Sequence, residues 1–344
     1  MVSKRPTVAD VARRAGTSTA VVSYVLNGGP RPVSDALRAR VSQAIEELDY
    51  RLDRRAQSLR RPRRWRQIGL LVPDLILPLF GEFVGSVERQ ARARDHLTMV
   101  GNTGYDPVRE AEFVSAFIEA GIDGLVVIGA CDAAEVAALC ARARVPVAWM
   151  HSMRGEIDAE IIGADHVEAG RLVTGHLAGI HGCRDIAFVG GFTEDDVTHG
   201  DRETVAQRFA GAVAACDAPL HQIRTDLTAD GAYAAVRDFL RVRPAPPDAV
   251  VVGTYGQTAA ATRALTDHGL RIPEDVRVVG FDGNQARYGP YDLTSARQPV
   301  DRIARRALDE LLTGPSAPAD RPAAAPSAPE LHLGDTCGCR TPRS

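Results

Sequence analysis

Short apolar runs alternate with helical patterns over most of this chain, and this alternation limits its fold more than any other feature. The run Ile-Gly-Leu-Leu-Val at 68–72 is continuously apolar, as expected of a strand buried on both faces of a sheet. Further strands are predicted at 97–101, 124–128, 147–150, 186–189, 249–252 and 276–281. Helical patterns separate them, at 83–93, 107–120, 133–141, 168–179, 205–215, 231–241, 258–268 and 300–312. Such repetition predicts an α/β fold of parallel sheets, and the length allows two doubly wound subdomains with a cleft between them.

The first 50 residues follow a different pattern, that of three short helices. Thr7 and Ser18 are placed to cap the first two helices, and Gly16 suits the left-handed position of a tight turn between them. A third helix is predicted from Ser34 to about Tyr50. The predicted buried residues are Val8, Val11, Ala12, Val21, Val22, Val25, Leu26, Leu37, Val41, Ile45 and Leu48. Two short helices with a tight turn and a supporting third helix describe a helix-turn-helix, which is a DNA-binding unit.

The charge of the chain is unevenly distributed. Residues 1–66 hold 15 Lys and Arg against 6 Asp and Glu, a balance of +9, whereas the whole chain has a net charge of −3. The remaining residues therefore carry −12. This division indicates a polyanion-binding head on an acidic body that does not itself adhere to nucleic acid.

The apolar runs, the N-terminal pattern and the cysteines of the sequence indicate in which compartment the protein works. No run approaches the roughly 18 apolar residues that span a membrane, and the N-terminus leads into a polar helical pattern rather than an apolar signal core. The six cysteines are scattered and do not form a disulfide framework. We therefore expect a cytoplasmic protein.

Cys337-Gly-Cys339, with His332 nearby, is the one candidate for a metal clip. Its spacing fits no standard zinc pattern, and the sequence offers no second ligand pair beside it. We therefore expect no metal site, and no cofactor is indicated.

Several short motifs fall in the head and the body. In the head they are Thr7-Val8-Ala9-Asp10-Val11-Ala12, Ala15-Gly16-Thr17-Ser18, Val22-Ser23-Tyr24-Val25-Leu26-Asn27-Gly28 and Ala44-Ile45-Glu46-Glu47-Leu48-Asp49-Tyr50. In the body they include Gly121-Ile122-Asp123-Gly124, Val279-Gly280-Phe281-Asp282 and Leu293-Thr294-Ser295-Ala296-Arg297-Gln298-Pro299. Together they resemble the LacI/GalR family of bacterial transcription regulators. The resemblance implies a helix-turn-helix domain at 1–51, a hinge helix and linker at 52–66, a periplasmic-binding-protein-like effector and dimerisation domain at 67–336, and a tail at 337–344.

The resemblance also implies which residues contact DNA. Thr19, Ala20 and Tyr24 match base-reading positions on the second helix, and Ser23, Asn27 and Arg31 match phosphate contacts. Leu59 matches the hinge leucine that wedges into the minor groove. For Thr7 and Tyr50, capping or packing alone is the alternative role. The full predicted set is Thr7, Ser18, Thr19, Ala20, Ser23, Tyr24, Asn27, Arg31, Tyr50, Arg54, Arg55, Ala56 and Leu59.

The predicted effector-binding residues are Leu79, Phe80, Arg208, Tyr255, Asp282 and Gln298. Arg208 matches the family's Arg-x-x-Gly motif, whose arginine clamps ligand oxygens, although a surface ion pair is its alternative role. Two departures change the expected ligand: Thr254-Tyr255 replaces a common Asn-Asp pair, and Asp165-His166 replaces a common Asp-Asn. An aromatic ring in place of a bidentate acceptor favours a glycoside, a nucleoside or another ring-bearing molecule over a plain sugar.

These features together predict a homodimeric repressor that binds operator DNA and responds to a small carbohydrate-like or nucleoside-like effector. The alternative is an effector-independent repressor with a degenerate pocket. Enzymatic activity is not expected, because the sequence has no Gly-rich phosphate loop after the first strand and no Ser/His/Asp or zinc signature. A dimer is favoured over a tetramer, since no C-terminal leucine heptads are present.

Overall fold

The computed structural model describes residues 8–27, 33–48, 66–153, 157–197, 200–283, 291–313 and 325–339. The chain divides into two compact units, Met1–Arg64 and Trp65–Ser344, which we call the head and the body. None of the described helices is both long and apolar enough to cross a membrane.

The head contains α1 (Val8–Ala15), α2 (Thr19–Asn27) and α3 (Asp35–Glu47), close to the predicted bounds. Gly16 has a φ of 62°, the left-handed conformation expected of this turn. The hydroxyl of Ser18 accepts a hydrogen bond from the backbone N–H of Val21 at 3.3 Å, which confirms the predicted cap. The predicted cap by Thr7 lies outside the described residues.

Apolar residues from all three helices form the core of the head. The buried members are Val11, Ala12, Ala15, Val22, Val41 and Ala44, with Val25, Ile45 and Leu48 partly buried against them. Arg40 of α3 fastens the turn, because its guanidinium donates to the carbonyl oxygens of Ala15, at 2.8 Å, and Gly16, at 3.2 Å. These carbonyls end α1 without helical partners, so the arginine satisfies them.

The first half of the body, which we call the N-subdomain, is built on a sheet with the order β2-β1-β3-β4-β5 among the described residues, parallel throughout. Its strands are β1 (Arg66–Val72), β2 (His96–Asn102), β3 (Gly124–Ala130), β4 (Val147–Met153) and β5 (Ile161–Ile162). Its helices are α5 (Pro78–Arg92), α6 (Pro107–Ala120), α7 (Ala133–Ala143) and α12 (Val300–Thr313).

The second half, the C-subdomain, is built on a sheet with the order β11-β10-β9-β8-β6-β7 in the described ranges. Its strands are β6 (Ile186–Gly190), β7 (His221–Arg224), β8 (Ala249–Val252), β9 (Arg277–Phe281), β10 (Thr294–Arg297) and β11 (Glu330–His332). Its helices are α8 (His166–His181), α9 (Arg202–Ala214), α10 (Ala229–Arg241) and α11 (Tyr255–Asp267), followed by the 3-10 helix η2 (Asp335–Cys337). All neighbours are parallel except β10 and β11, which are antiparallel.

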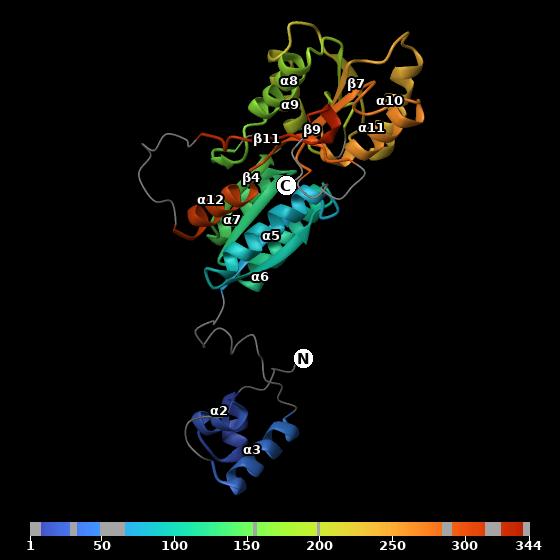
Figure 1. Cartoon of the computed structure of the whole chain (residues 1–344). Helices are drawn as coiled ribbons and strands as arrows, with labels where there is room; N and C mark the ends of the chain where they lie inside the picture. Colours follow the sequence, from blue (N-terminus) through green and yellow to red (C-terminus); the bar gives the residue numbers. More distant parts are fainter. Residues whose placement is uncertain are drawn as a thin grey trace. The chain divides into compact units, whose positions relative to one another are not determined.

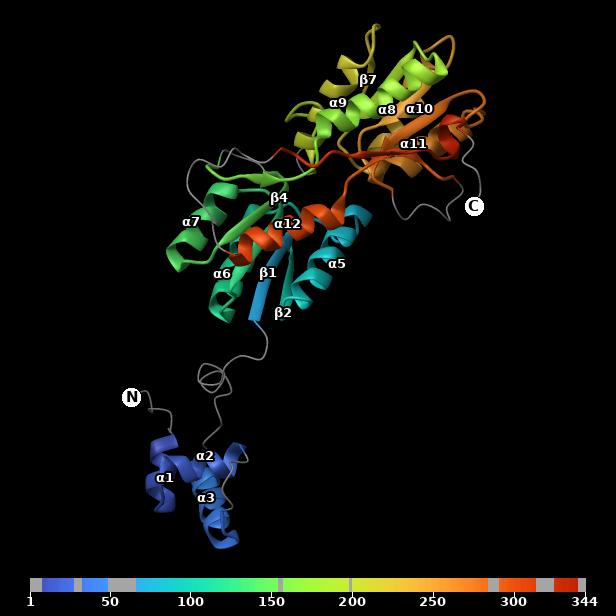
Figure 2. The same cartoon turned by 60° about the vertical axis from the view of Figure 1, so that its left-hand side comes forward.

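Helices cover both faces of each sheet, which confirms the predicted doubly wound architecture. In β1, Ile68, Leu70 and Val72 belong to the core under α5 and α12, whereas Leu71 belongs to the core under α6 and α7. This alternation follows from the two-residue period of a strand. The helix α12 packs beside α5 although more than 200 residues separate them in sequence (Figures 1 and 2). The N-subdomain is therefore completed by a segment near the end of the chain.

The structure corrects three expectations. The helix predicted at 83–93 begins at Pro78, so Leu79 and Phe80 lie in its first turn. Proline is favoured at that position because its missing N–H would have no helical partner. The strands β5, β7, β10 and β11 were not predicted, and their burial is partial or interrupted except in β10. The segment assigned to a tail from residue 337 starts inside the body, since Cys337 is fully buried.

Candidate functional site

The helix α2 presents an exposed face in the head. Ser18, Thr19, Ala20 and Ser23 are exposed, Tyr24 is half-buried, and Val22 on the opposite side has no exposed surface. This is the orientation needed for a helix that inserts side chains into the major groove. The backbone of Asn27 is described as the last residue of α2. The other predicted DNA contacts, Thr7, Arg31, Tyr50, Arg54, Arg55, Ala56 and Leu59, lie outside the described residues.

In the body, a buried polar network lies at the carboxyl ends of the strands of the C-subdomain. The guanidinium of Arg208 donates to the carbonyl oxygen of Gly253 at 2.9 Å and to the carboxylate of Asp282 at 3.1 Å. The side-chain amide of Gln298 donates to the other oxygen of that carboxylate at 3.0 Å. Arg208, Asp282 and Gln298 are 3%, 3% and 6% exposed, so the predicted clamp is buried and is not a surface ion pair. The face of the Phe281 ring lies 4.4 Å from the guanidinium carbon.

Close helix packing positions Arg208. A Cβ on Gly211 would lie 1.8 Å from the carbonyl oxygen of Val167, and a Cβ on Gly170 would lie 1.9 Å from the carbonyl oxygen of Arg208. The two glycines therefore let the backbones of α8 and α9 touch. The Arg-x-x-Gly motif has a physical explanation here: its glycine sets the helix crossing that presents its arginine to Asp282.

Asp282 has a φ of 62°, unusual for a residue with a side chain. Its backbone N–H donates to the carbonyl of Ala296 at 2.9 Å, and the hydroxyl of Ser295 donates to its carbonyl at 2.6 Å. These bonds from β10 hold the costly conformation, and such outliers concentrate at binding sites.

A second polar group joins the two subdomains. His151 lies in β4, and Asp201 caps α9 by accepting from the backbone of Thr204. The Nε2 atom of His151 lies 2.6 Å from the Asp201 carboxylate, whose other oxygen accepts from the hydroxyl of Ser152 at 2.9 Å. Burial alone would raise the pKa of Asp201, but the charge and the hydrogen bond of His151 hold that pKa well below its usual value. The carboxylate is therefore ionised and bridges the subdomains.

Aromatic rings surround this bridge. Phe80 packs against His151 in a T-shaped arrangement at 5.6 Å between ring centroids, and His166 also makes a T-shaped contact with His151, at 5.4 Å. Burial, reinforced by the charges of Arg208 and His151, lowers the pKa of His166 well below its ordinary value, so its imidazole is neutral. Both of its ring nitrogens are buried, and neither has a hydrogen-bond partner within the part of the chain that the structure describes.

A small cavity of about 10 Å³ lies beside the bridge, with room for about one water. Its walls come from the N-subdomain, through Pro73, Phe80 and Gly129, and from the C-subdomain, through Asp201 and Glu203. Pro73 follows β1 and Gly129 lies in β3, the two strands at which the order of the first sheet reverses. Ligands of open α/β sheets bind at such switch points, outside the carboxyl ends of the strands.

The structure brings most of the predicted effector residues together. Arg208, Asp282 and Gln298 form one network, and Phe80 lies across the cleft beside His151. Tyr255 adjoins the network, because its ring would meet a Cβ on Gly283 at 2.9 Å. Leu79 instead packs partly buried against the core of the N-subdomain. Sequence reasoning missed His151, Ser152 and Asp201, which belong to no motif; for His166 the departure from Asp-Asn was the only signal.

Comparisons with known proteins agree with this architecture. Residues 7–53 match the family model described as bacterial regulatory proteins of the lacI family, and residues 174–337 match a periplasmic binding protein-like domain. The chain is 30% identical over 318 residues to the transcriptional repressor PurR of Erwinia tasmaniensis, covering 89% of both proteins. It is 30% identical over 315 residues to the transcriptional regulator PtxS of Pseudomonas aeruginosa, covering 90% of this chain and 88% of that protein.

Among solved structures, the lac repressor dimer bound to operator and the anti-inducer ONPF superposes with a TM-score of 0.68 at 24% identity, over 97% of this chain and 99% of that one. The complex of the regulator CelR with cellobiose gives a TM-score of 0.64 at 24% identity, over 96% and 100%. A helix-turn-helix head joined to a two-subdomain binding body defines a DNA-binding transcription regulator. The chain belongs to the LacI family.

Proposed function

We propose that this chain is a repressor that binds operator DNA as a homodimer and that changes its operator affinity when a small molecule enters the cleft of the body. One observation carries the second half of this proposal. Arg208 Nε, Gln298 Oε1 and both ring nitrogens of His166 are buried without hydrogen-bond partners among the described residues. Unpaired buried polar atoms are rare and costly, and a ligand in the crevice would pair them.

The expected ligand is a ring with several polar substituents. Arg208 and Asp282 offer a donor and an acceptor at one end, while Phe80, His151 and His166 offer ring surfaces. The hydroxyl of Thr254 is already engaged with the side chain of Gln257 at 3.1 Å. A carbohydrate-like or nucleoside-like effector fits this mixture of stacking and charged groups. Relatives have been solved with ribose, with lactose and with cellobiose.

Such a ligand would act by tying the subdomains together. Phe80 and His151 belong to the N-subdomain, and Arg208 and Asp282 belong to the C-subdomain. A molecule that contacts both sets favours the arrangement in which the two subdomains lie close together. Operator affinity changes only if the DNA-binding segments bind operator better in one arrangement of the subdomains than in the other. A difference of ~2–3 kcal/mol between the arrangements changes operator occupancy by about a hundredfold.

The predicted DNA contacts of α2 and of the hinge, with Leu59 as the minor-groove wedge, complete the proposal. Two copies of the head would bind a pseudo-palindrome of abutting half-sites, as expected of a two-fold dimer. A protein with this target acts on the chromosome, in the cytoplasm. Binding rather than catalysis is its role, and its named relatives are regulators of transcription.

The test combines a thermal-shift screen of sugars, glycosides and nucleosides with an operator-binding assay on the full chain. A molecule that raises the unfolding temperature should also change operator affinity. Arg208→Ala and Gln298→Ala should keep operator binding and lose that response. Arg263→Ala is the matched control, because Arg263 forms an exposed pair with Asp267 in the same subdomain. A normal response in both pocket variants would reject the pocket assignment.

One observation favours the effector-independent alternative. The bridge from Asp201 to His151 and Ser152 closes the cleft with protein side chains, and the adjoining cavity measures about 10 Å³. If no small molecule in the screen changes operator affinity, this alternative replaces the effector-controlled one.

A further inference from the structure

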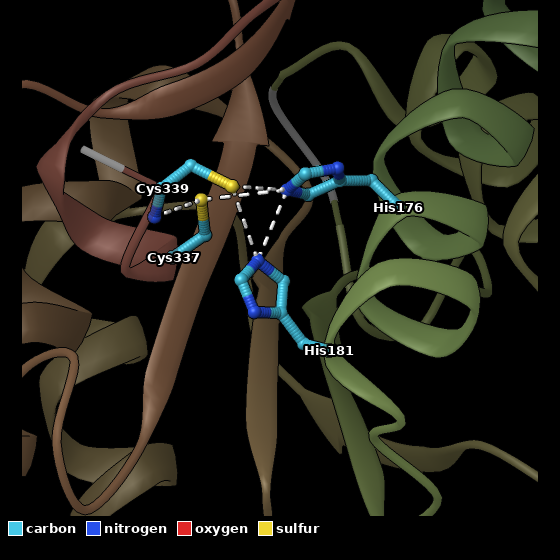
Figure 3. Close-up of side chains that lie close together, drawn as sticks. All are labelled: His176, His181, Cys337 and Cys339. Atoms are coloured by element: carbon cyan, nitrogen blue, oxygen red, sulfur yellow. Dashed lines mark hydrogen bonds between the residues drawn. The ribbon is translucent and has the colours of Figure 1, made fainter. Parts of the chain in front are cut away.

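Two histidines and two cysteines meet far from the cleft, at the end of the C-subdomain. His176 and His181 come from the last part of α8, Cys337 ends η2, and Cys339 follows two residues later. His176 and Cys337 are 161 residues apart in sequence. Their ligand-capable atoms, two Nε2 and two Sγ, all lie within 4.8 Å of one another and point at a common centre (Figure 3).

Four of the six separations between these atoms match the edges of a zinc tetrahedron, and all six are within 4.8 Å. The Nε2 atom of His176 lies 3.4 Å from the sulfur of Cys337 and 3.4 Å from the sulfur of Cys339, while Nε2 of His181 lies 3.4 Å from the latter sulfur. The two Nε2 atoms are 3.2 Å apart. Four ligands at usual Zn–N and Zn–S lengths would have edges of about 3.3 Å between nitrogens and about 3.5 Å between nitrogen and sulfur.

Hydrogen bonding alone does not account for this arrangement. The Nε2 atom of His176 has three neighbours at 3.2–3.4 Å, namely one nitrogen and two sulfurs. A ring nitrogen offers one hydrogen or one lone pair, so it cannot satisfy three partners. A cation at the centre would receive one lone pair from each of the four atoms.

The surroundings of Cys337 suit a thiolate. This residue is fully buried, and its sulfur accepts from the hydroxyl of Thr294 at 3.0 Å and from the backbone N–H of Cys339 at 3.4 Å. The hydroxyl of Thr294 is itself oriented, because it accepts from the N–H of Gly334 at 2.9 Å. Donors of this kind fix and stabilise metal-bound sulfur.

We propose that His176, His181, Cys337 and Cys339 bind one Zn²⁺ ion as a structural site. Two nitrogen and two sulfur ligands in a tetrahedron select zinc among the common divalent ions, and four protein ligands leave no open position for catalysis. Each thiol releases its proton to solvent when it binds the ion. The ion fastens the segment that follows β11 to α8, and it does so whether or not the cleft takes an effector.

The first experiment titrates the chelator-treated, reduced full chain with Co²⁺. One equivalent per chain should produce a thiolate-to-cobalt charge-transfer band and the intense visible bands of tetrahedral Co²⁺. One equivalent of Zn²⁺ should abolish both, and Zn²⁺ alone should raise the unfolding temperature. Absence of stoichiometric binding, or a spectrum of octahedral Co²⁺ without the charge-transfer band, would overturn the proposal.

Variants identify the ligands. Cys339→Ser and His181→Asn change half-buried residues, so the fold is expected to persist, as circular dichroism would check. Both should lose the stoichiometric site and the zinc-dependent rise in unfolding temperature. Cys216→Ser is the matched control, a cysteine packed partly buried against the same core but outside the cluster. Thr294→Val should weaken zinc binding about 10–100-fold while leaving the tetrahedral spectrum. Wild-type affinity in both ligand variants, or its loss in Cys216→Ser, would contradict the assignment.

Discussion

Replacing Gly211 by alanine tests whether backbone contact between α8 and α9 builds the arginine site. The added Cβ would lie 1.8 Å from the carbonyl oxygen of Val167 and 3.0 Å from the backbone nitrogen of Arg171. Both neighbours are backbone atoms, so no side-chain rotation relieves the clash and the helices must separate. Because Arg208 lies one turn before Gly211 on α9, this separation also moves its guanidinium away from Asp282.

The expected decrease in the free energy of unfolding is the difference between two opposing contributions. Overpacking costs about 1–3 kcal/mol, and a clash with backbone belongs at the upper end, about 3 kcal/mol. Alanine in a helix interior stabilises the helix by about 1 kcal/mol relative to glycine. The net loss is about 2 kcal/mol, which for a unit of this size lowers the unfolding temperature by about 4–8 °C.

Gly175→Ala on α8 is the matched control, and it should change stability in the opposite direction. Its added Cβ would lie 3.9 Å from the Cβ of Ala215, an ordinary contact, so the helix-propensity gain of up to about 1 kcal/mol remains. Thermal and denaturant unfolding of the full chain, followed by circular dichroism, measures both variants. If Gly211→Ala unfolds at or above the wild-type temperature, α8 and α9 do not touch as described.

Three further outcomes are expected. Operator affinity should fall about 10³–10⁵-fold between 50 and 200 mM salt if six to ten phosphates are neutralised. An operator affinity that does not change with salt in a filter-binding or anisotropy assay would show that the basic head does not engage phosphate. Leu59→Ala should lower specific operator affinity and spare weak non-specific binding, so equal loss of both would contradict the wedge assignment. Burial works to raise the pKa of Asp196, but hydrogen bonds from Arg224 and from two backbone N–H groups lower this pKa from 3.8 to about 2. The ionised Asp196 carboxylate therefore stabilises the folded protein above about pH 4, and this contribution is lost as the pH falls through about 2. The difference in unfolding free energy between wild type and Asp196→Asn should therefore shrink across that range, and a constant difference in denaturant titrations would contradict this.

The parts of the fold that the sequence predicted well are those with strong local signals. Gly16 marks its turn because only a left-handed residue fits there, and Ser18 marks the start of α2 because its hydroxyl caps the helix. The buried parallel strands are continuous apolar runs, and β8 at Ala249–Val252 matches its prediction at both ends. In these cases local chemistry and the final fold favour the same structure.

The missed elements lack such signals. The strand β7 buries only Ile223 of its four residues, since it lies at the edge of the sheet, and β11 is an edge strand without a fully buried residue. The start of α5 was placed too late because Pro78 resembles a helix break in sequence, whereas in space it occupies the first turn.

In the candidate sites too, the sequence indicated the residues that fall in motifs and missed those that only the fold brings together. Arg208 and Asp282 fall in recognisable motifs, so the sequence indicated both, but it could not show that they pair with each other. The bridge between His151 and Asp201 joins residues from different subdomains, and no local pattern marks either of them. For the cysteine pair at 337 and 339, sequence analysis considered His332, which instead lies 2.9 Å from Asp292. The second ligand pair comes from α8, which only the fold brings close.

The place of α12 in the chain has a consequence for biosynthesis. Val300, Ile303, Ala304, Ala307, Leu308 and Leu311 of this helix fill the core of the N-subdomain beside α5. When the ribosome has completed β4, that face of the sheet has only α5 to cover it, and the remaining cover is about 150 residues away. At about 5–20 residues per second, the nascent N-subdomain waits roughly 8–30 s with an apolar groove open to solvent. During that interval the groove exposes apolar surface of the kind that chaperones bind, and the strands β6 to β10 of the C-subdomain are synthesised before the half that precedes them can close.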